Sequence, residues 1–246
     1  MFNFFVDNTA ISGDKCYISG ADFNHIKNVL RLKESDQVLI SHDGISSLCE
    51  LLSFSENTVL FKIVVENYQD TALPIEIYLF QGLPKADKFE LIIQKAVELG
   101  AHKIVPVQMK RSIVKIEDKK KKDKVNRWQA ISESSAKQSK RTSIPEICPI
   151  IDFKDAVTKA KDFDLVLIPY ENKLGMSETL SALKQIKSGM KVAVFIGPEG
   201  GFDESEIELA KQNGAKIISL GKRILRTETA SITAVGMLML YAETSL

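Results

Sequence analysis

From residue 75 onward the sequence alternates between short apolar segments and amphipathic ones, and this alternation limits the fold more than any other feature. The pattern predicts strands at 75–80, 104–107, 165–169, 192–196 and 217–220, and helices at 86–99, 117–138, 152–161, 176–187, 204–213 and 228–243. Strands that alternate with helices form a mostly parallel sheet with both faces covered. We therefore expect an α/β fold for this part of the chain.

Two of these helices carry clear end signals. Asp203 followed by Glu206 predicts a capping box for the helix after Phe202, with Phe202 and Ile207 as a hydrophobic staple. Gly100 predicts the end of the helix at 86–99 because glycine adopts the left-handed backbone conformation that often follows a helix.

The first 70 residues follow a different pattern, which is typical of short strands. The segments 2–6, 37–41, 47–54 and 58–65 are apolar or alternating, and one short helix is predicted at about 22–30. This indicates a small β-barrel or sandwich with a helical insert. The polar segment 67–72 precedes Pro74, so we place a domain boundary there, between domains 1–72 and 73–246.

Several functional classes lose support from what the sequence lacks. No apolar run reaches the roughly 18 residues of a membrane span, and the first residues lack the basic segment of a signal peptide. Cys16, Cys49 and Cys148 lie far apart in the sequence, which predicts neither a disulfide framework nor a zinc site. There is no nucleotide-binding glycine motif, metalloprotease motif or serine-hydrolase elbow. We expect a cytoplasmic protein without a metal site.

Two loops between a predicted strand and a predicted helix are candidates for a ligand site. The first, 196–202, reads Ile-Gly-Pro-Glu-Gly-Gly-Phe, and the second runs from Leu220 to Ala230. Ligands of open α/β sheets bind outside the carboxyl ends of strands, where glycine permits close backbone approach. Two tight turns are the alternative. They explain one glycine per loop, but not three glycines, a proline and a carboxylate within five positions.

The charge of the chain is concentrated in one stretch. Residues 103–141 hold 13 basic and 4 acidic side chains, a net charge of +9, although the whole chain has a net charge of +1. Five of the basic residues, which we call the lysine run, are Lys119, Lys120, Lys121, Lys122 and Lys124. A solvated helix face is the ordinary interpretation of such a run. Neutralisation of nucleic-acid phosphates is the other, and we favour it.

Five segments in one order resemble a known family. They are His25 with 29–31, 85–88 with 94–100, 127–128 with 136–141, 196–202, and 220–230. With them the chain resembles the RsmE family, the ribosomal RNA (uracil-N3) methyltransferases of the SPOUT class. The resemblance covers nearly the whole length, and the last two segments together are its most specific part.

The resemblance implies a fold, a reaction and its partners. It implies a PUA-like β-barrel followed by a trefoil-knotted SPOUT methyltransferase domain, a homodimer, and S-adenosylmethionine as methyl donor. The implied substrate is N3 of a specific uridine in 16S ribosomal RNA of the small subunit. The implied cofactor-binding residues are Pro169, Ile196, Gly197, Pro198, Gly200, Gly201, Leu220, Gly221, Leu225 and Thr229. The implied RNA-binding residues are His25, Arg31, Lys85, Lys88, Arg111, Gln138, Ser139 and Arg141.

Methylation of uracil N3 needs a proton acceptor and a donor for the developing negative charge. Glu228 and Glu199 are candidates for the acceptor, and Arg226 is the candidate for the donor. Each has a structural alternative: favourable charge at a helix N-terminus for Glu228, loop N–H groups for Glu199, and an ion pair for Arg226. For Glu199 we favour the structural alternative. The sequence also leaves open whether a general base is used at all.

The RNA contacts, the role of the last apolar segment and the function itself each allow more than one interpretation. Asn3 and Ser35 depart from the family pattern, in which a basic residue and a glycine are common, so the RNA contacts of the first domain stay open. The apolar segment 232–241 predicts core packing, and the resemblance adds a dimer interface. The rival functions are methylation of another RNA site or a ribose 2′-hydroxyl, and RNA binding without catalysis.

Overall fold

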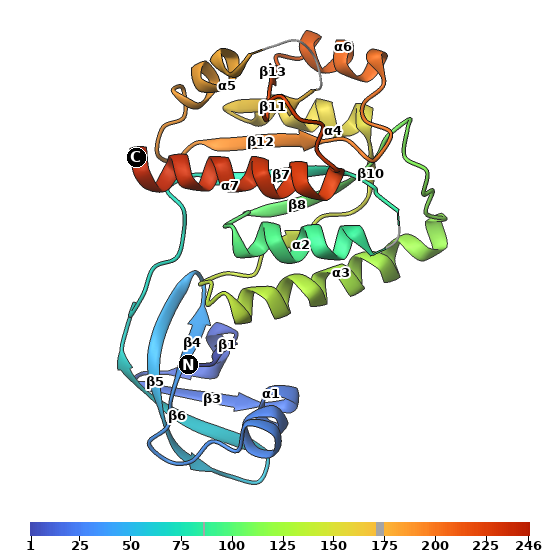
Figure 1. The fold of residues 1–246 in the computed structure, drawn as a ribbon. Helices are drawn as coiled ribbons and strands as arrows, with labels where there is room; N and C mark the ends of the chain where they lie inside the picture. The colour runs from blue at the N-terminus through green and yellow to red at the C-terminus, as the bar shows by residue number, and fades with distance from the viewer. Residues whose placement is uncertain (86, 171–174) are drawn as a thin grey trace. The chain divides into compact units, whose positions relative to one another are not determined.

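The computed structural model of the protein describes residues 1–85, 87–170 and 175–246 (Figure 1). The chain forms two compact units. The first comprises Met1–Ala72 together with Ser134–Ile144, and the second comprises Leu73–Glu133 and Pro145–Leu246. The predicted boundary after residue 72 assumes two consecutive domains, and the return of 134–144 to the first unit was not expected from the sequence.

The first unit is built on a six-stranded sheet. Its strands are β1 (Asn3–Phe5), β2 (Ile11–Ser12), β3 (Lys15–Ser19), β4 (Gln37–His42), β5 (Ile45–Phe54) and β6 (Thr58–Val65). They lie in the order β1-β4-β5-β6-β3-β2, with β1 and β4 parallel and the other neighbours antiparallel. Alternate strand residues such as Cys16, Ile18 and Phe61 are buried in its core.

The helical insert of the first unit starts earlier than predicted and changes type. It consists of α1 (Gly20–Asn24) and a π-helical segment, η2 (His25–Leu30), after a short 3₁₀ turn, η1 (Asn8–Ala10). Arg31 ends it with a left-handed backbone, φ 54°. The side chains of Phe23 and Ile26 anchor the insert in the core of the sheet.

The segment 134–144 is joined to the first unit by polar contacts. The side-chain amide of Asn3 is buried, donates to the carbonyl of Arg141 at 3.0 Å and accepts from Ser41 Oγ at 3.0 Å. Gln69 Nε2 donates to the carbonyl of Lys140 at 3.1 Å. Asn3, which departs from the family pattern, therefore holds the backbone at the end of this segment.

The second unit contains a seven-stranded sheet in which every pairing is parallel. Its strands are β7 (Glu76–Gly82), β8 (Lys103–Gln108), β9 (Glu146–Ile147), β10 (Ile151–Asp152), β11 (Leu165–Pro169), β12 (Lys191–Ile196) and β13 (Lys216–Ile218). The order is β10-β8-β7-β12-β11-β13, and β9 pairs with β8. The predicted α/β class and parallel sheet are confirmed.

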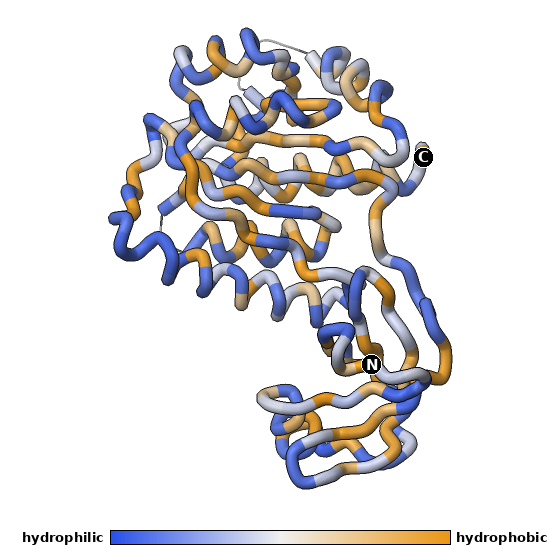
Figure 2. The backbone as a smooth tube through the Cα atoms, turned by 180° about the vertical axis from the view of Figure 1, so that it is seen from behind, coloured by the Kyte–Doolittle hydropathy of each residue, from blue (hydrophilic) through white to orange (hydrophobic). Residues whose placement is uncertain are grey.

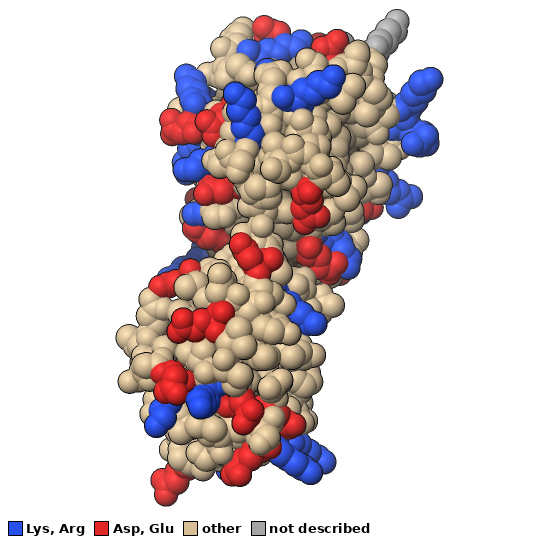
Figure 3. All heavy atoms as spheres, turned by 90° about the vertical axis from the view of Figure 1, so that its left-hand side faces the viewer, with Lys and Arg blue, Asp and Glu red and all other residues tan. Residues whose placement is uncertain are grey.

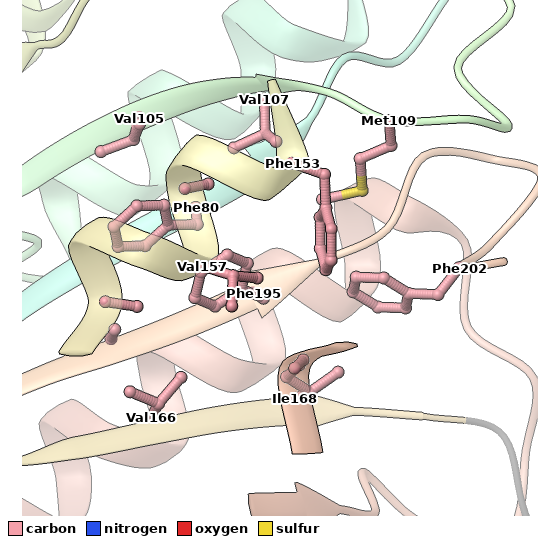
Figure 4. Packing of buried hydrophobic residues seen from close by; sticks show 14 of the residues in the cluster. Phe80, Val105, Val107, Met109, Phe153, Val157, Val166, Ile168, Phe195 and Phe202 are labelled. Carbon is pink, nitrogen blue, oxygen red and sulfur yellow. The ribbon is translucent and has the colours of Figure 1, made fainter. Parts of the chain in front are cut away.

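Helices cover both faces of this sheet. They are α2 (Lys88–Glu98), α3 (Asp118–Gln138), α4 (Phe153–Lys159), η3 (Ala160–Asp162), α5 (Met176–Leu183), α6 (Glu204–Gln212) and α7 (Thr227–Ser245). On one face α4 and α6 bury Phe153 and Ile207 against strand residues such as Phe195 (Figure 4). On the other, α7 contacts β7 and β12 and packs against α2. The strands between these layers are mainly hydrophobic in Figure 2.

The six predicted helices of the second unit are confirmed, with ends that move by a few residues. The capping box of Asp203 and Glu206 is present. Gly100 has φ +93° at the end of α2, and a Cβ there would lie 2.6 Å from the Leu73 side chain. The two-residue strands β2, β9 and β10 were not predicted, because pairing with a neighbour defines them rather than a local sequence pattern.

The five-residue strand β3 was also missed. It alternates strictly between exposed and buried positions, but only Cys16 and Ile18 face the core. No helix among the described residues is long and apolar enough to cross a membrane. The implied knot stays a prediction.

Candidate active site

Four loops of the second unit leave the carboxyl edge of the parallel sheet. They follow β7, β8, β12 and β13, at residues 83–85 with 87, 109–117, 197–203 and 219–226. Because the strands are parallel, these loops start at the same edge, where ligands of open α/β sheets bind. Both ligand loops predicted from the sequence start at this edge.

The β12 loop, residues 197–203, folds closely over its neighbours. Gly82 and Pro198 are so near that a Cβ on Gly82 would lie 2.6 Å from Pro198 Cδ. A Cβ on Gly197 would lie 3.1 Å from the Gly201 backbone. Gly201 itself has φ +66° and no heavy atom within 4 Å of its Cβ position. The loop is thus packed on one side and open at Gly201.

Gly200 packs against Arg111 of the β8 loop. A Cβ on Gly200 would lie 2.9 Å from Arg111 Cβ and 3.1 Å from the Arg111 carbonyl oxygen. Arg111 Nη1 donates to the Gly200 carbonyl at 3.4 Å, and its Nη2 lies 3.5 Å from Asp203 Oδ2. Arg111, predicted as an RNA contact, therefore also braces the glycine-rich loop, and Gly200 is required for that close packing.

A buried polar network joins the start of α7 to the end of β7 and the β12 loop. Thr227 Oγ1 donates to the Gly197 carbonyl at 2.6 Å, and Gln81 Nε2 donates to Thr227 Oγ1 at 3.0 Å. Ser231 Oγ donates to the Thr227 carbonyl at 2.8 Å and contacts Gln81 Oε1. All three side chains are buried. Satisfied buried networks rigidify the groups they connect, so this one fixes the Gly197 carbonyl relative to α7.

We expect Thr227→Val to destabilise the protein and to weaken cofactor binding. Valine keeps the shape but leaves the Gly197 carbonyl and a Gln81 N–H without their buried partner, a loss of roughly 1–3 kcal/mol. Urea unfolding gives the stability and calorimetry gives the S-adenosylmethionine affinity. Thr233→Val, on the exposed face of the same helix, is the matched control. Equal unfolding midpoints for the two variants would contradict a role of the network.

Three charged side chains meet beside these loops. The Lys88 ammonium, on the first turn of α2, lies 3.0 Å from Glu199 Oε1 and 3.6 Å from Glu228 Oε2. The backbone N–H of Lys85 also donates to Glu199 Oε1 at 3.0 Å. The side chains of Glu199 and Glu228 are 23% and 16% exposed. We call this group the Lys88 cluster.

The two carboxylates of the Lys88 cluster differ in their partners. Burial acts to raise the pKa of Glu199, but the backbone N–H groups of Glu199 and Lys85 and the Lys88 ammonium outweigh it and hold that pKa below its ordinary value. The hydrogen bond to Glu199 in turn raises the pKa of Lys88. By contrast, Glu228 Oε2 is buried and accepts no hydrogen bond from any described residue.

The β13 loop, residues 219–226, is anchored at its start and exposed at its end. Thr179 Oγ1 donates to the Ser219 carbonyl at 2.7 Å and accepts from the Ser219 N–H at 2.9 Å. Gly221 has φ +109°, a conformation that favours glycine. Ile224 is 79% exposed, and Arg226 is exposed at the N-cap position of α7.

The other predicted cofactor residues lie in or next to the same loops. Ile196 is the buried last residue of β12, and Pro169 is the last residue of β11 at the same edge. Leu220 and Leu225 are half-buried, and Thr229 is exposed on the first turn of α7. The residues after Tyr170, 171–174, lie outside the described residues. The structure therefore gathers the predicted cofactor set at one edge, and its contacts with a ligand stay a prediction.

The predicted RNA-binding residues fall in both units. His25 and Arg31 are exposed in the first unit, and Lys85, Lys88 and Arg111 border the loops of the second. Gln138 is exposed at the end of α3, and Ser139 follows it half-buried. Arg141 is only 8% exposed, and burial lowers the pKa of its guanidinium to about 10. Of this set, Arg141 offers the least surface to RNA.

Sequence reasoning missed the network of Gln81, Thr227 and Ser231 as well as the clustering of Lys88 with two glutamates. Thr227 stands inside the second predicted loop, so the sequence had already placed this residue at the candidate site. Gln81 lies in an apolar strand, where a buried polar residue signals a specific partner. In the β12 loop, packing closes the Cβ positions of Gly197 and Gly200, whereas the Cβ position of Gly201 is open.

Comparison with known proteins identifies this arrangement. Residues 71–239 match the family model of the RNA methyltransferase domain, and residues 18–64 match that of the RNA methyltransferase PUA domain. The chain is 39% identical to the ribosomal RNA small subunit methyltransferase E of Bacillus subtilis over 230 residues, which cover 92% of this chain and 90% of that protein.

Solved structures agree with the sequence comparison. A crystal structure of a hypothetical protein covers 98% of both chains with 35% identity and a TM-score of 0.91. The ribosomal RNA small subunit methyltransferase E of Neisseria gonorrhoeae, solved bound to S-adenosyl methionine, has 28% identity and a TM-score of 0.82, covering 98% of this chain and 97% of that one. The chain belongs to the RsmE family of ribosomal RNA small subunit methyltransferases, with a PUA-like domain and a SPOUT-like methyltransferase domain.

Proposed function

We propose that this protein transfers the methyl group of S-adenosylmethionine to N3 of a specific uridine in 16S ribosomal RNA of the small subunit. The observation that carries the proposal is the pair of loops after β12 and β13 at one edge of the sheet, with the Gln81–Thr227–Ser231 network joining the β12 loop to the start of α7, in a chain of this family. The Neisseria gonorrhoeae relative is bound to S-adenosyl methionine and has the same fold. This supports the same methyl donor here.

The residues of this chain would act by placement and electrostatics. The backbone groups of Gly197, Gly200 and Gly221 would hold the donor, which supplies a sulfonium methyl group when bound. The exposed Arg226 guanidinium, at the start of α7, would face the uracil carbonyl oxygen on which negative charge develops. A fixed donor aimed at developing charge lowers the barrier of the chemical step. Alignment of the reacting atoms supplies much of the remaining reduction of the barrier.

Further parts of the proposal concern domains and assembly. We propose domains at 1–72 and 73–246, supported by the family matches at 18–64 and 71–239. A homodimer through α7 is consistent with Leu240, which is apolar and 57% exposed on that helix. A cytoplasmic location follows from a ribosomal RNA substrate.

The lysine run is proposed to contact RNA phosphates. It lies in the first turns of α3, a hydrophilic segment in Figure 2, and all five residues are at least partly exposed. Lys119 and Lys120 pair with Glu117, and Lys121 pairs with Asp118 at 2.8 Å. Exposed pairs of this kind contribute little to stability, so the run can exchange them for phosphates. On the face shown in Figure 3, acidic and basic side chains are interspersed without a patch of one sign.

Replacement of the five lysines of the run by glutamine should flatten the salt dependence of RNA binding. Each phosphate contact adds roughly 0.7–0.9 to the slope of log K against log salt, so the slope should fall by up to about 4. Binding of small subunits over a salt series measures it, and calorimetry should show unchanged cofactor affinity. An unchanged slope would identify the run as a solvated helix face.

Labelled cofactor tests the function. The protein should transfer label from S-adenosylmethionine to 16S RNA in small subunits lacking the modification. Transfer to a different RNA would identify another methyltransferase of this class. RNA binding without cofactor affinity or transfer would identify a binding protein that has only kept the fold.

A further inference from the structure

The Lys88 cluster distinguishes the two glutamates that the sequence offered as proton acceptors. Glu199 Oε1 is engaged by the Lys85 N–H and the Lys88 ammonium, both at 3.0 Å. These contacts stabilise its charged form and weaken its affinity for a proton. Glu199 is therefore a structural carboxylate that ties the β12 loop to the start of α2.

Glu228 makes fewer and longer contacts than Glu199. Its Oε2 is buried, accepts no hydrogen bond from any described residue, and lies 3.6 Å from an ammonium that sits closer to Glu199. The contact described for Glu228 is the 3.6 Å approach of the Lys88 ammonium, which is longer than the 3.0 Å contact of Lys88 with Glu199. A buried polar atom with so weak a partner calls for an explanation, and a functional role is one.

We infer that Glu228 accepts the N3 proton of the substrate uracil, and that Lys88 is a positioning residue that holds this carboxylate beside the loops. The inference rests on the proposed function and deepens it. In the contacts described, Lys88 on α2 faces Glu228, and Glu199 of the β12 loop faces Lys88. Lys88 is thereby assigned to Glu228 rather than to an RNA phosphate.

Methyl transfer to uracil N3 moves one proton and two electron pairs. The N3–H proton passes to the carboxylate of Glu228, which becomes a carboxylic acid and later releases the proton to water. The electron pair left on N3 forms the bond to the methyl carbon. As that bond forms, the bond between the methyl carbon and sulfur breaks, and its electron pair stays on the sulfur, which becomes a neutral thioether. The charge that spreads over the uracil carbonyl oxygens is met by Arg226.

Four variants distinguish a catalytic role of Glu228 from a structural one. Glu228→Gln keeps size and removes the basic carboxylate, Lys88→Met removes the ammonium, and Lys88→Arg restores a positive charge. Lys95→Met is the matched control, since Lys95 lies on the same helix and pairs only locally with Glu98 in the contacts described. We expect Glu228→Gln to lower the single-turnover rate about 10²- to 10⁴-fold, the range of general base catalysis, with cofactor affinity within about threefold of wild type.

A binding measurement that needs no turnover completes the test. In the presence of S-adenosylhomocysteine, wild-type protein should prefer RNA with the target uridine over the same RNA with 3-methyluridine, which has no N3–H to donate. Glu228→Ala and Lys88→Met should reduce this preference, whereas Lys88→Arg should recover part of it and Lys95→Met should keep it. Normal turnover in Glu228→Gln, or an unchanged preference in Glu228→Ala, would overturn the inference.

The two proposals fail differently. If the wild-type protein methylates an atom other than uracil N3, the proposed function is wrong. If it methylates N3 while the Glu228 variants keep the wild-type rate and preference, only the assignment of Glu228 is wrong. If Lys88→Met merely unfolds at lower temperature with wild-type preference, Lys88 is structural.

Discussion

Gly200→Ala should abolish most of the affinity for S-adenosylmethionine while leaving cooperative unfolding intact. The added methyl group would lie 2.9 Å from Arg111 Cβ and 3.1 Å from its carbonyl oxygen, and both atoms are close to or part of the backbone. The β12 loop must therefore shift away from the β8 loop. Calorimetry of cofactor binding measures the effect, which we expect to exceed tenfold, about 1.4 kcal/mol.

A matched glycine variant separates the loop from a general effect of added bulk. A Cβ on Gly236 in α7 would make only ordinary contacts with Leu99, at 3.8 and 3.9 Å. Gly236→Ala should therefore bind cofactor normally, and the gain in helix propensity should favour stability. Undiminished cofactor affinity in Gly200→Ala would remove this loop from the cofactor site.

Arg226→Ala should lower kcat by about 10²–10³ with little change in cofactor affinity, because loss of one donor to developing charge has an effect of that size. Steady-state rates with small subunits measure kcat, and calorimetry measures cofactor binding. Arg223→Ala, at an exposed position of the same loop, controls for lost positive charge. Equal rates for the two variants would remove Arg226 from the reaction.

Local patterns predicted most of the second unit. The strand at 192–196, the glycine loop after it and the capping box at Asp203 are all encoded in neighbouring residues, and the structure contains each of them. The short strands β9 and β10 escaped prediction because they exist only through pairing with β8. The return of 134–144 to the first unit is likewise a long-range effect, which includes the contact between Asn3 and Arg141.

The sequence predicted the loops of the candidate site but not the contacts between their side chains. The sequence placed Glu199 and Glu228 in two loops and favoured a structural role for Glu199, but it could not show which groups hold either carboxylate. Those contacts involve Lys88, which is more than a hundred positions away from both and reaches them only in the fold. The buried Gln81 escaped notice for the same reason, since its partners Thr227 and Ser231 lie in the last helix.

Identification of the methylated base shows directly whether the protein methylates uracil N3 in 16S RNA. Small subunits lacking the modification would be incubated with the protein and S-adenosylmethionine, and the 16S RNA digested to nucleosides and analysed by mass spectrometry against synthetic standards. We expect one 3-methyluridine per 16S RNA, at a single position, and none with the Gly200→Ala protein. A 2′-O-methylated nucleoside, a methyl group on another base, or no modification would contradict this expectation.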